Sequence, residues 1–399
     1  MAAPTVRRAT AADAEGIWEV FRTCFGAAPA ERDHWLAHLD PERAMVIDGP
    51  QGEVAAMTHV RPFEQWFGGR AVPLGGYSPV GVLPQHRNRG WGRAVCEAQL
   101  PDLRERGEVI AGLFPASLAF YRSLGFECAG SYVQRRFPVG DLASIRPSRP
   151  VEVRRGTVED LPAVHRGHAA AAPGRDGSLV RSAHWWAHLL APDLQGVELY
   201  VVDDPTRVGE VIGYAAYRHR SVRAPYDYAI SVFEVLSDDP DVLRALWQVV
   251  ASSGTQAPEV DVIGPAEDDL FLLADGASPD VVRSEIRWML RLVDLPGAIA
   301  ARGWPSTAVG RVELEVVDDQ APWNAGRWVL EVEGGQARAT PGGAGTVQAT
   351  IGGLSSWWAG YAPPARLART GSLRSTDAAA IQVMAELLPA SPPVLPDFY

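Results

Sequence analysis

The sequence predicts two copies of an α/β fold followed by a separate α+β domain. Three observations carry this prediction: an internal repeat, a glycine-bearing turn between a strand and a helix, and a C-terminal region of strands and helices outside the repeat. A chain of 399 residues provides for two or three domains. Because 47% of the residues are hydrophobic, each domain can bury a core.

The internal repeat has an offset of roughly 150 residues. The pattern Val-Arg-Arg-x-Thr-x-x-Asp occurs at Val6–Asp13 and again at Val153–Asp160, and His-Trp-x-Ala-His-Leu occurs at His34–Leu39 and again at His184–Leu189. A period this long indicates a duplicated domain rather than a solenoid. In each copy the Thr-x-x-Asp pattern predicts a helix start directly after a short strand.

The stretch Ser78–Arg93 connects a predicted strand to a predicted helix through a basic turn. Pro79 and Gly81 interrupt the apolar strand, which is typical of an edge, a bulge or a close backbone approach. The pattern Arg-x-x-Gly-x-Gly follows, and residues 94–100 favour a helix. A helix entered through such a turn directs unpaired N–H groups and the positive end of its dipole at one spot. The turn therefore predicts a site for a phosphate group.

This spacing, after a Val-x-Val strand, resembles the pyrophosphate-binding motif of the GNAT (Gcn5-related) N-acetyltransferases. The resemblance implies that the turn holds the diphosphate of acetyl-coenzyme A (acetyl-CoA). The residues assigned to cofactor binding in this way are Val80, Gly81, Val82, Arg87, Asn88, Arg89, Gly90, Trp91, Gly92 and Arg93. The three-glycine dinucleotide fingerprint has other spacings, and the lysine-containing nucleotide loop is excluded because the chain has no lysine.

The second copy has lost this turn. At the corresponding place, residues 232–241 keep the strand and lead into a helix, but the glycines are gone and Asp238, Asp239 and Asp241 have been gained. Aspartates cap a helix well, yet they repel a diphosphate. We therefore expect the second copy to keep the fold without binding the cofactor.

The net charge of −11 is unevenly distributed. Residues 1–138 contain 15 arginines and 15 acidic residues, so the acidic excess lies in the rest of the chain. An acidic body argues against a nucleic-acid partner and mildly favours cationic substrates, although solubility alone is the simpler explanation of the charge. No apolar run reaches the length of a membrane span and the N-terminus has no signal-peptide pattern, so we expect a cytoplasmic protein without a membrane partner.

The positions of cysteine and histidine do not suggest a metal site. Three widely spaced cysteines fit neither a disulfide framework nor zinc, and we expect them to be buried thiols: Cys24, Cys96 and Cys128. His34 and His38 have the four-residue spacing of ligands on one helix face, but the pair recurs as His184 and His188, where the cofactor turn is lost. We therefore expect these histidines to pack, and we expect no metal.

The remaining segments complete the domain organisation. Residues 139–150 are rich in Pro, Arg and Ser and are expected to form a linker. The third region shows no nucleophile–base–acid arrangement. Its expected strands and helices are Gly310–Val317, Gly326–Val332, Val347–Ile351, Leu354–Gly360 and Ala378–Leu388.

Over its whole length, the chain resembles the "enhanced intracellular survival" (Eis) family of N-acetyltransferases. The segments that carry this resemblance are Val80–Val82, Arg87–Arg93, Tyr121–Phe126, Leu246–Trp247, Val293–Ala298 and Pro396–Tyr399. The resemblance implies tandem GNAT acyl-CoA N-acyltransferase domains, the first active and the second degenerate, and then a sterol-carrier-protein-like domain. We expect these domains at residues 1–140, 141–292 and 293–399. The resemblance also implies a homo-oligomer, typically a hexamer.

Acyl transfer to an amine needs a polarised thioester carbonyl, a neutral amine and a proton for the departing thiolate. We expect the backbone N–H of Val80 to polarise the carbonyl from a bulged strand. Tyr121 lies in Phe120–Phe126, which we expect to form a short helix ended by a glycine before another strand. A phenol with a pKa of about 10 suits proton donation to a thiolate whose thiol has a pKa near 8.5. In the family the tyrosine at this place is the general acid; packing on the sheet is the alternative role.

The resemblance also implies that an aromatic C-terminal residue, here Tyr399, places its α-carboxylate in the active site. A free carboxylate is a weak base with a pKa of about 3.5, so it acts either as a base after burial or by orienting the amine or a water. Substrate-binding candidates are Phe25, Trp35, Ser78 and Phe114. Family substrates are polycationic amines, among them aminoglycosides and lysine side chains. The carboxylates here that could meet such a substrate are Asp33 and Asp397.

Two other classes of function are open at this stage. A non-catalytic lipid or small-molecule binding protein could use the third domain with an inactive GNAT fold, but the intact Arg87, Gly90, Gly92 and Tyr121 argue against it. A tRNA-dependent aminoacyl transferase also pairs two such folds. That function predicts no coenzyme A turn and a basic face, and neither prediction fits the sequence.

Overall fold

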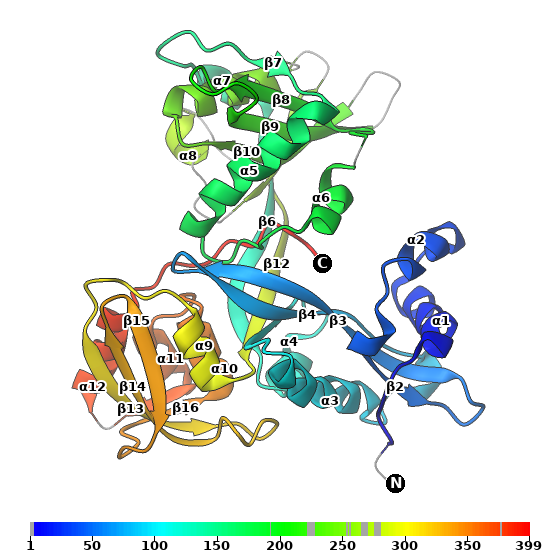
Figure 1. The fold of residues 1–399 in the computed structure, drawn as a ribbon, viewed down its shortest axis with the longest axis vertical. Helices are drawn as coiled ribbons and strands as arrows, with labels where there is room; N and C mark the ends of the chain where they lie inside the picture. The colour runs from blue at the N-terminus through cyan, green and yellow to red at the C-terminus, as the bar shows by residue number, and fades with distance from the viewer. Residues whose placement is uncertain are drawn as a thin grey trace. The chain divides into compact units, whose positions relative to one another are not determined.

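The computed structural model describes residues 4–399 except 192, 222–227, 253, 255–256, 265–269, 275–280 and 376. The contacts group the chain into two compact units (Figure 1). Unit 1 comprises Met1–Ala129, Trp288–Pro392 and Tyr399, and unit 2 comprises Gly130–Arg287 and Pro393–Phe398. The predicted fold class is confirmed, with an α/β sheet in each unit and an additional α+β domain in unit 1.

The first sheet of unit 1 has the strand order β1-β2-β3-β4-β5-β12. Neighbouring strands are antiparallel, except that β4 and β5 are parallel. The strands are β1 (Arg7–Arg8), β2 (Ala44–Asp48), β3 (Val54–Phe67), β4 (Arg70–Val82), β5 (Ile110–Leu113) and the end of β12 (Val281–Leu292).

Helices cover both faces of this sheet, because alternate residues of a strand point to opposite sides. Ala44 and Val46 of β2 pack in one cluster with α1, whereas Met45 and Ile47 pack in another cluster with Val95 of α3. The helices of this part are α1 (Ala14–Phe25), α2 (Arg32–Leu36), α3 (Trp91–Glu105) and α4 (Leu118–Arg122).

The C-terminal domain of unit 1 has a five-stranded sheet in the order β15-β14-β13-β16-β17. Its strands are β13 (Gly310–Val317), β14 (Gly326–Glu333), β15 (Gln336–Pro341), β16 (Val347–Thr350) and β17 (Leu373–Ser375), and its helices are α9 (Leu295–Ala301), α10 (Ile351–Trp358), α11 (Pro364–Thr370) and α12 (Ala378–Leu387). The expected elements are present. The sequence had not led us to expect α9, α11, β15 or β17. Strand β15 lies in a glycine-rich stretch that gives a weak strand signal.

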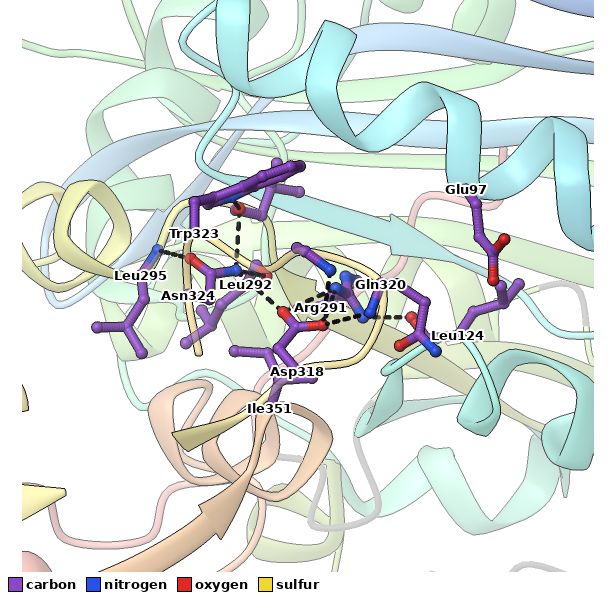
Figure 2. A network of polar contacts seen from close by, with 12 residues as sticks. Glu97, Leu124, Arg291, Leu292, Leu295, Asp318, Gln320, Trp323, Asn324 and Ile351 are labelled. Carbon is purple, nitrogen blue, oxygen red and sulfur yellow. Dashed lines mark hydrogen bonds and ion pairs between the residues drawn. The ribbon is translucent and has the colours of Figure 1, made fainter. Parts of the chain in front are cut away.

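A buried ion pair joins this domain to the first acetyltransferase-like part of the same unit (Figure 2). Both side chains of the Arg291–Asp318 pair are inaccessible to solvent, with Nη2–Oδ1 and Nη2–Oδ2 distances of 2.6 and 2.8 Å. Arg291 also donates to the Leu124 carbonyl just after α4. Asn324 donates to Asp318 (3.1 Å) and accepts from the Leu295 N–H (2.9 Å), so hydrogen bonds of the cluster link four segments of the chain.

The sheet of unit 2 has the strand order β6-β11-β10-β9-β8-β7. Its elements are β6 (Glu127–Pro138), β7 (Arg154–Arg155), α5 (Leu161–Ala171), α6 (Ala183–Leu190), β8 (Glu198–Asp203), β9 (Val211–Ser221), β10 (Tyr228–Ser237), α7 (Pro240–Ala251), β11 (Glu259–Gly264) and α8 (Leu270–Leu273). The stretch expected as a linker is packed rather than loose. Val139–Ser144 form a 3-10 helix, and Leu142 and Ile145 are buried in the core of this unit.

The internal repeat is confirmed at the level of individual contacts. Arg7 bonds Asp13 and Asp48, each at 2.7 Å. Arg154 makes the same two contacts with its own helix start and strand, through Asp160 and Asp203 at 2.7 and 2.6 Å. These arginines hold the pKa of Asp13 and Asp160 below the usual carboxyl range.

The last strand of each repeat is exchanged. By sequence β6 follows the first copy, yet Val133–Pro138 pair with β11 of the second copy. By sequence β12 ends the second copy, yet Met289–Leu292 pair with β5 of the first copy. The three consecutive domains expected from the sequence remain a prediction. The exchange of β6 and β12 is a feature that this consecutive division does not include.

Two further expectations concern single features. Cys96 and Cys128 are buried thiols as expected, whereas Cys24 is half-buried. Along the described parts of the chain, no helix has both the length and the apolar character needed to cross a bilayer.

We predict that Asp318→Asn destabilises the fold by about 3–5 kcal/mol, because it leaves the Arg291 guanidinium buried without its counter-charge. The measurement is urea unfolding followed by circular dichroism. The control is Arg338→Gln, which removes an arginine that is 73% exposed and paired with Glu331, and should cost less than about 1 kcal/mol. Equal stability of Asp318→Asn and the parent protein would contradict the importance of this pair.

Candidate functional site

The turn before α3 has the backbone shape that the sequence indicated. Asn88 and Gly90 have φ angles of 62° and 77°, in the left-handed region that favours glycine and tolerates asparagine. Gly90 caps α3, and a Cβ built there would meet no atom within 4 Å. The first N–H groups of α3 therefore lie at an open turn, where an anion can approach.

The arginines of the turn are held mainly by neutral groups. Arg87 donates to the Val82 carbonyl (3.2 Å), and the Arg89 guanidinium lies 5.6 Å from the centroid of the Trp91 ring. Neither pairs with a carboxylate among the residues the structure describes. Arg93 bonds Glu97 (3.0 Å) and Ser123 Oγ (2.5 Å), which ties α3 to the end of α4. Two of the three charges thus remain available to an anion.

Strand β4 is bulged at Ser78 and Pro79. Val60 pairs with Tyr77 and Thr58 with Val80, so β4 carries one more residue than β3 across this interval. His59, which lies opposite the bulge, donates from Nδ1 to the Ser78 carbonyl (3.1 Å). Burial lowers the pKa of His59 to about 4, so the ring is neutral with its proton on Nδ1.

Strands β4 and β5 part directly before this bulge. Their pairing ends at Gly76 and Gly112. Farther along, Leu83 N donates to Ala55 O on β3 (2.9 Å), and backbone groups in an antiparallel pair alternate between facing the partner strand and turning away from it. Val80 lies three residues before Leu83, so its N–H points away from β3. It points toward the side on which β5 has stopped pairing with β4. Gly81 packs against α1, where a Cβ would come 2.8 Å from Val20.

Tyr121 lies in α4, whose start is capped by Ser117 and whose exit turns at Gly125, with a φ angle of 80°. The Tyr121 side chain is 8% exposed and packs edge-on against Phe120 and Phe126, with centroid distances of 4.9 and 6.0 Å. Burial raises its pKa well above the usual value, so the phenol stays protonated at neutral pH.

The ring of Tyr399 lies among the strands of unit 1. Its centroid is 4.9 Å from that of Phe63 on β3 and 5.6 Å from that of Phe114, which follows β5. Cβ atoms built on Gly76 and Gly112 would approach the ring to 2.9 and 2.8 Å. The two residues predicted to be catalytic, Tyr121 and Tyr399, thus both belong to unit 1.

The predicted amine-binding residues fall into two groups. Phe114 contacts Tyr399, and Ser78 forms the bulge. Phe25 and Trp35 lie instead in an aromatic cluster of α1 and α2, where Phe21 stacks on both at 5.3 and 4.8 Å. Phe25 is 54% exposed at the end of α1.

The carboxylates considered for a cationic substrate are engaged elsewhere. Asp397 is 1% exposed and accepts hydrogen bonds from Arg181 Nε (3.0 Å) and Trp185 Nε1 (3.1 Å), all within unit 2. Asp397 is thus a buried partner of Arg181 and Trp185, and a contact with the amine stays a prediction. Asp33 is exposed and bonds its neighbour Arg32 (2.5 Å).

The paired histidines, which were expected to pack rather than to bind a metal, lie at the surface. His34 and His38 are exposed, with ring centroids 4.5 Å apart, and His188 stacks on Trp185 at the surface of α6. Within the described ranges, no three His, Cys, Asp or Glu side chains are grouped as metal ligands.

The second copy shows why its turn differs from the first. Strand β10 is bulged next to Glu234, as β4 is at Ser78. Asp239, however, accepts hydrogen bonds from the N–H groups of Asp241 (2.8 Å) and Val242 (3.1 Å) at the start of α7. The N–H groups that face an open turn in the first copy are thus occupied by a carboxylate in the second. A cleft of about 760 Å³ beside this turn is lined partly by Asp238 and Asp239.

Sequence analysis missed four residues of the site: His59, Phe63, Gly76 and Gly112. The glycines carried a usable signal, because glycine inside a short apolar strand marks a close approach of another group. His59 and Phe63 gave no signal, because their roles depend on partners on other strands.

Comparison with known proteins agrees with this geometry. Models described as "Acetyltransferase (GNAT) domain" match residues 5–129 and 177–292, and a model described as "Sterol carrier protein domain" matches residues 295–396. An uncharacterised N-acetyltransferase of Streptomyces coelicolor is 30% identical over 77% of this chain and 78% of its own length. The N-acetyltransferase Eis of Mycobacterium tuberculosis is 28% identical over 88% of this chain and 87% of its own length.

The crystal structure of a GCN5-related N-acetyltransferase from Anabaena variabilis superimposes with a TM-score of 0.90 at 26% identity, covering 99% of this chain and 100% of that one. Architecture, motif and relatives therefore agree. The chain belongs to the Eis family of GNAT N-acetyltransferases, with two GNAT domains followed by a sterol carrier protein domain.

Proposed function

We propose that this N-acetyltransferase moves an acetyl group from acetyl-CoA to a primary amine of a cationic small molecule, such as an aminoglycoside, by direct attack in a ternary complex. One observation carries the proposal: in unit 1, the parted strands β4 and β5 are followed by an open, arginine-bearing turn at the start of α3. The family resemblance adds an expected homo-oligomer, with a hexamer as the expected state.

The residues of the turn fit the diphosphate of acetyl-CoA. The left-handed Asn88 and Gly90 expose the first N–H groups of α3, and Arg87 and Arg89 add charge that no described carboxylate neutralises. Acetyl-CoA supplies an activated thioester. In the proposal, Gly90, Gly92 and the three arginines hold its diphosphate, and the N–H of Val80 donates to the thioester carbonyl.

In the proposal, Tyr121 is the general acid. Its phenol is kept protonated by burial, so at neutral pH a proton is available for the departing thiolate. Phe120 and Phe126 pack against its ring and restrict its orientation.

On the amine side, the proposal uses Tyr399, Phe114 and Ser78. The carboxylate of Tyr399 either accepts a proton from the amine or orients it, and the face of Phe114 can contact an ammonium group. Trp35 and Phe25 are proposed to contact more distant parts of the substrate. The net charge of −11 favours the approach of a cation.

The function is tested by following thiol release from acetyl-CoA with a panel of amines and identifying the acetylated product by mass spectrometry. Arg87→Gln should raise the KM for acetyl-CoA about tenfold, because a charge-assisted contact of about 1.4 kcal/mol is lost. The control is Arg149→Gln, which removes the arginine paired with Asp239 at the turn of the second copy and should leave this KM unchanged. Absence of thiol release with every amine would refute the proposal.

Tyr121→Phe should lower kcat by about 10²–10⁴-fold with little change in either KM, because the general acid is lost while the ring still packs. Since burial raises the pKa of Tyr121, its ionisation should cause no loss of rate up to pH ~10. The control is Tyr77→Phe: Tyr77 belongs to the same core cluster and donates to the Cys96 carbonyl (3.1 Å). If both variants kept the parent rate, Tyr121 would be a packing residue.

Adding a Gly-Ser-Gly segment after Tyr399 should lower kcat at least about 100-fold while the thermal midpoint stays within a few degrees, because the carboxylate is replaced by an amide. The same segment added at the N-terminus is the control. An unchanged kcat after C-terminal extension would remove the Tyr399 carboxylate from the mechanism.

A further inference from the structure

Gly76 and Gly112 face each other as the last paired residues of β4 and β5. We propose that this glycine pair is a seat for the aromatic ring of Tyr399 and that the fit of ring to seat positions the carboxylate of the same residue. The inference rests on the role that the proposed function gives to Tyr399. It makes Gly76 and Gly112 positioning residues.

The absence of side chains, rather than backbone conformation, explains these glycines. Neither is among the residues with a positive φ angle, so the backbone at both positions would accept any L-amino acid. A Cβ on Gly112, however, would come 2.8 Å from the Tyr399 hydroxyl oxygen, and one on Gly76 would come 2.8 Å from the Phe63 ring and 2.9 Å from Tyr399 Cε2. These distances are shorter than carbon side chains adopt, so the space at Gly112 is needed for Tyr399 and the space at Gly76 for the adjoining rings of Phe63 and Tyr399.

Aromatic rings close the sides of the seat. Phe63 is tilted by 46° to the Tyr399 ring, and Phe114 meets it edge-on at 71°. Leu74 lies beside Gly112, where a built Cβ would be 3.2 Å from its Cδ1 atom. Only two torsion angles separate the ring of Tyr399 from its backbone. When the ring is held on one face and two sides, the backbone of Tyr399 therefore has little freedom to move.

Ring position matters because the reacting groups must be placed to within a fraction of an ångström. The seat lies at the point where β4 and β5 part, and Gly76 lies four residues before Val80 along β4. The seat therefore fixes Tyr399 at the same opening toward which the Val80 N–H turns. A displaced ring would misplace the carboxylate and leave the acetyl-CoA turn unaffected.

The sharpest test enlarges the side chain at Gly112 and removes the hydroxyl group of Tyr399, separately and together. Gly112→Ala should lower kcat by about 10- to 100-fold with an unchanged KM for acetyl-CoA, since the new methyl group meets the hydroxyl. Tyr399→Phe keeps the ring and carboxylate and should lower kcat only a few-fold. In the double variant the hydroxyl is gone, so its kcat should exceed that of Gly112→Ala at least about threefold, a coupling that a general packing defect does not produce.

Two further variants control for stability. Gly140→Ala adds a methyl group where a Cβ meets no atom within 4 Å and should keep the parent kcat and thermal midpoint. Tyr399→Trp leaves both strands intact but exceeds the seat, and should lower kcat at least about tenfold without lowering the thermal midpoint. If Gly112→Ala proves too unstable to assay, Tyr399→Trp decides in the same way.

A parent-like kcat for Gly112→Ala or Tyr399→Trp, or a double variant no faster than Gly112→Ala, would overturn the seat. These outcomes are distinct from failure of the proposed function. If the extended protein loses activity while Gly112→Ala does not, the carboxylate acts without the seat. If the extended protein keeps its rate, the carboxylate role itself is wrong.

Discussion

In the proposed mechanism, the separation of β4 from β5 after the paired residues Gly76 and Gly112 determines where chemistry takes place in unit 1. Two parallel strands that continued to pair would satisfy each other's backbone groups and leave no donor for a substrate. The bulge at Ser78 and Pro79, held by His59, turns the Val80 N–H toward the opening. Tyr121 and Tyr399 are placed from elements that follow β5 or pack on it, so each proposed role depends on this divergence.

The two copies show how one architecture presents different charges at the same turn. Both keep the arginine that joins helix start to strand, and both keep a bulge in the corresponding strand. They differ in what faces the helix start after that strand: exposed arginines before α3, and the Asp239 carboxylate before α7. A carboxylate already bonded to those N–H groups excludes a diphosphate by occupancy as well as by repulsion.

Local patterns were readable from the sequence, and contacts between distant segments were not. The repeat, the basic turn and the short helix of Tyr121 each follow from residues a few positions apart, so their elements were predicted correctly. Asp397 was considered as a contact for the substrate because its partners Arg181 and Trp185 could not be recognised from the sequence, where they lie more than 200 positions away. The exchange of β6 and β12 could not be recognised from the sequence, because the apolar pattern of a strand does not specify which of the two sheets it joins.

The exchanged strands also constrain how the gene could have changed after its duplication. Strand β12, at the end of the second copy, completes the sheet of the first copy, and β6, at the end of the first copy, completes the sheet of the second. Removing either copy at the repeat boundary would therefore leave an unpaired strand edge in the other. Such an edge invites aggregation, and the halves can no longer be shuffled as independent modules. The second copy is therefore needed to complete the sheet of the first.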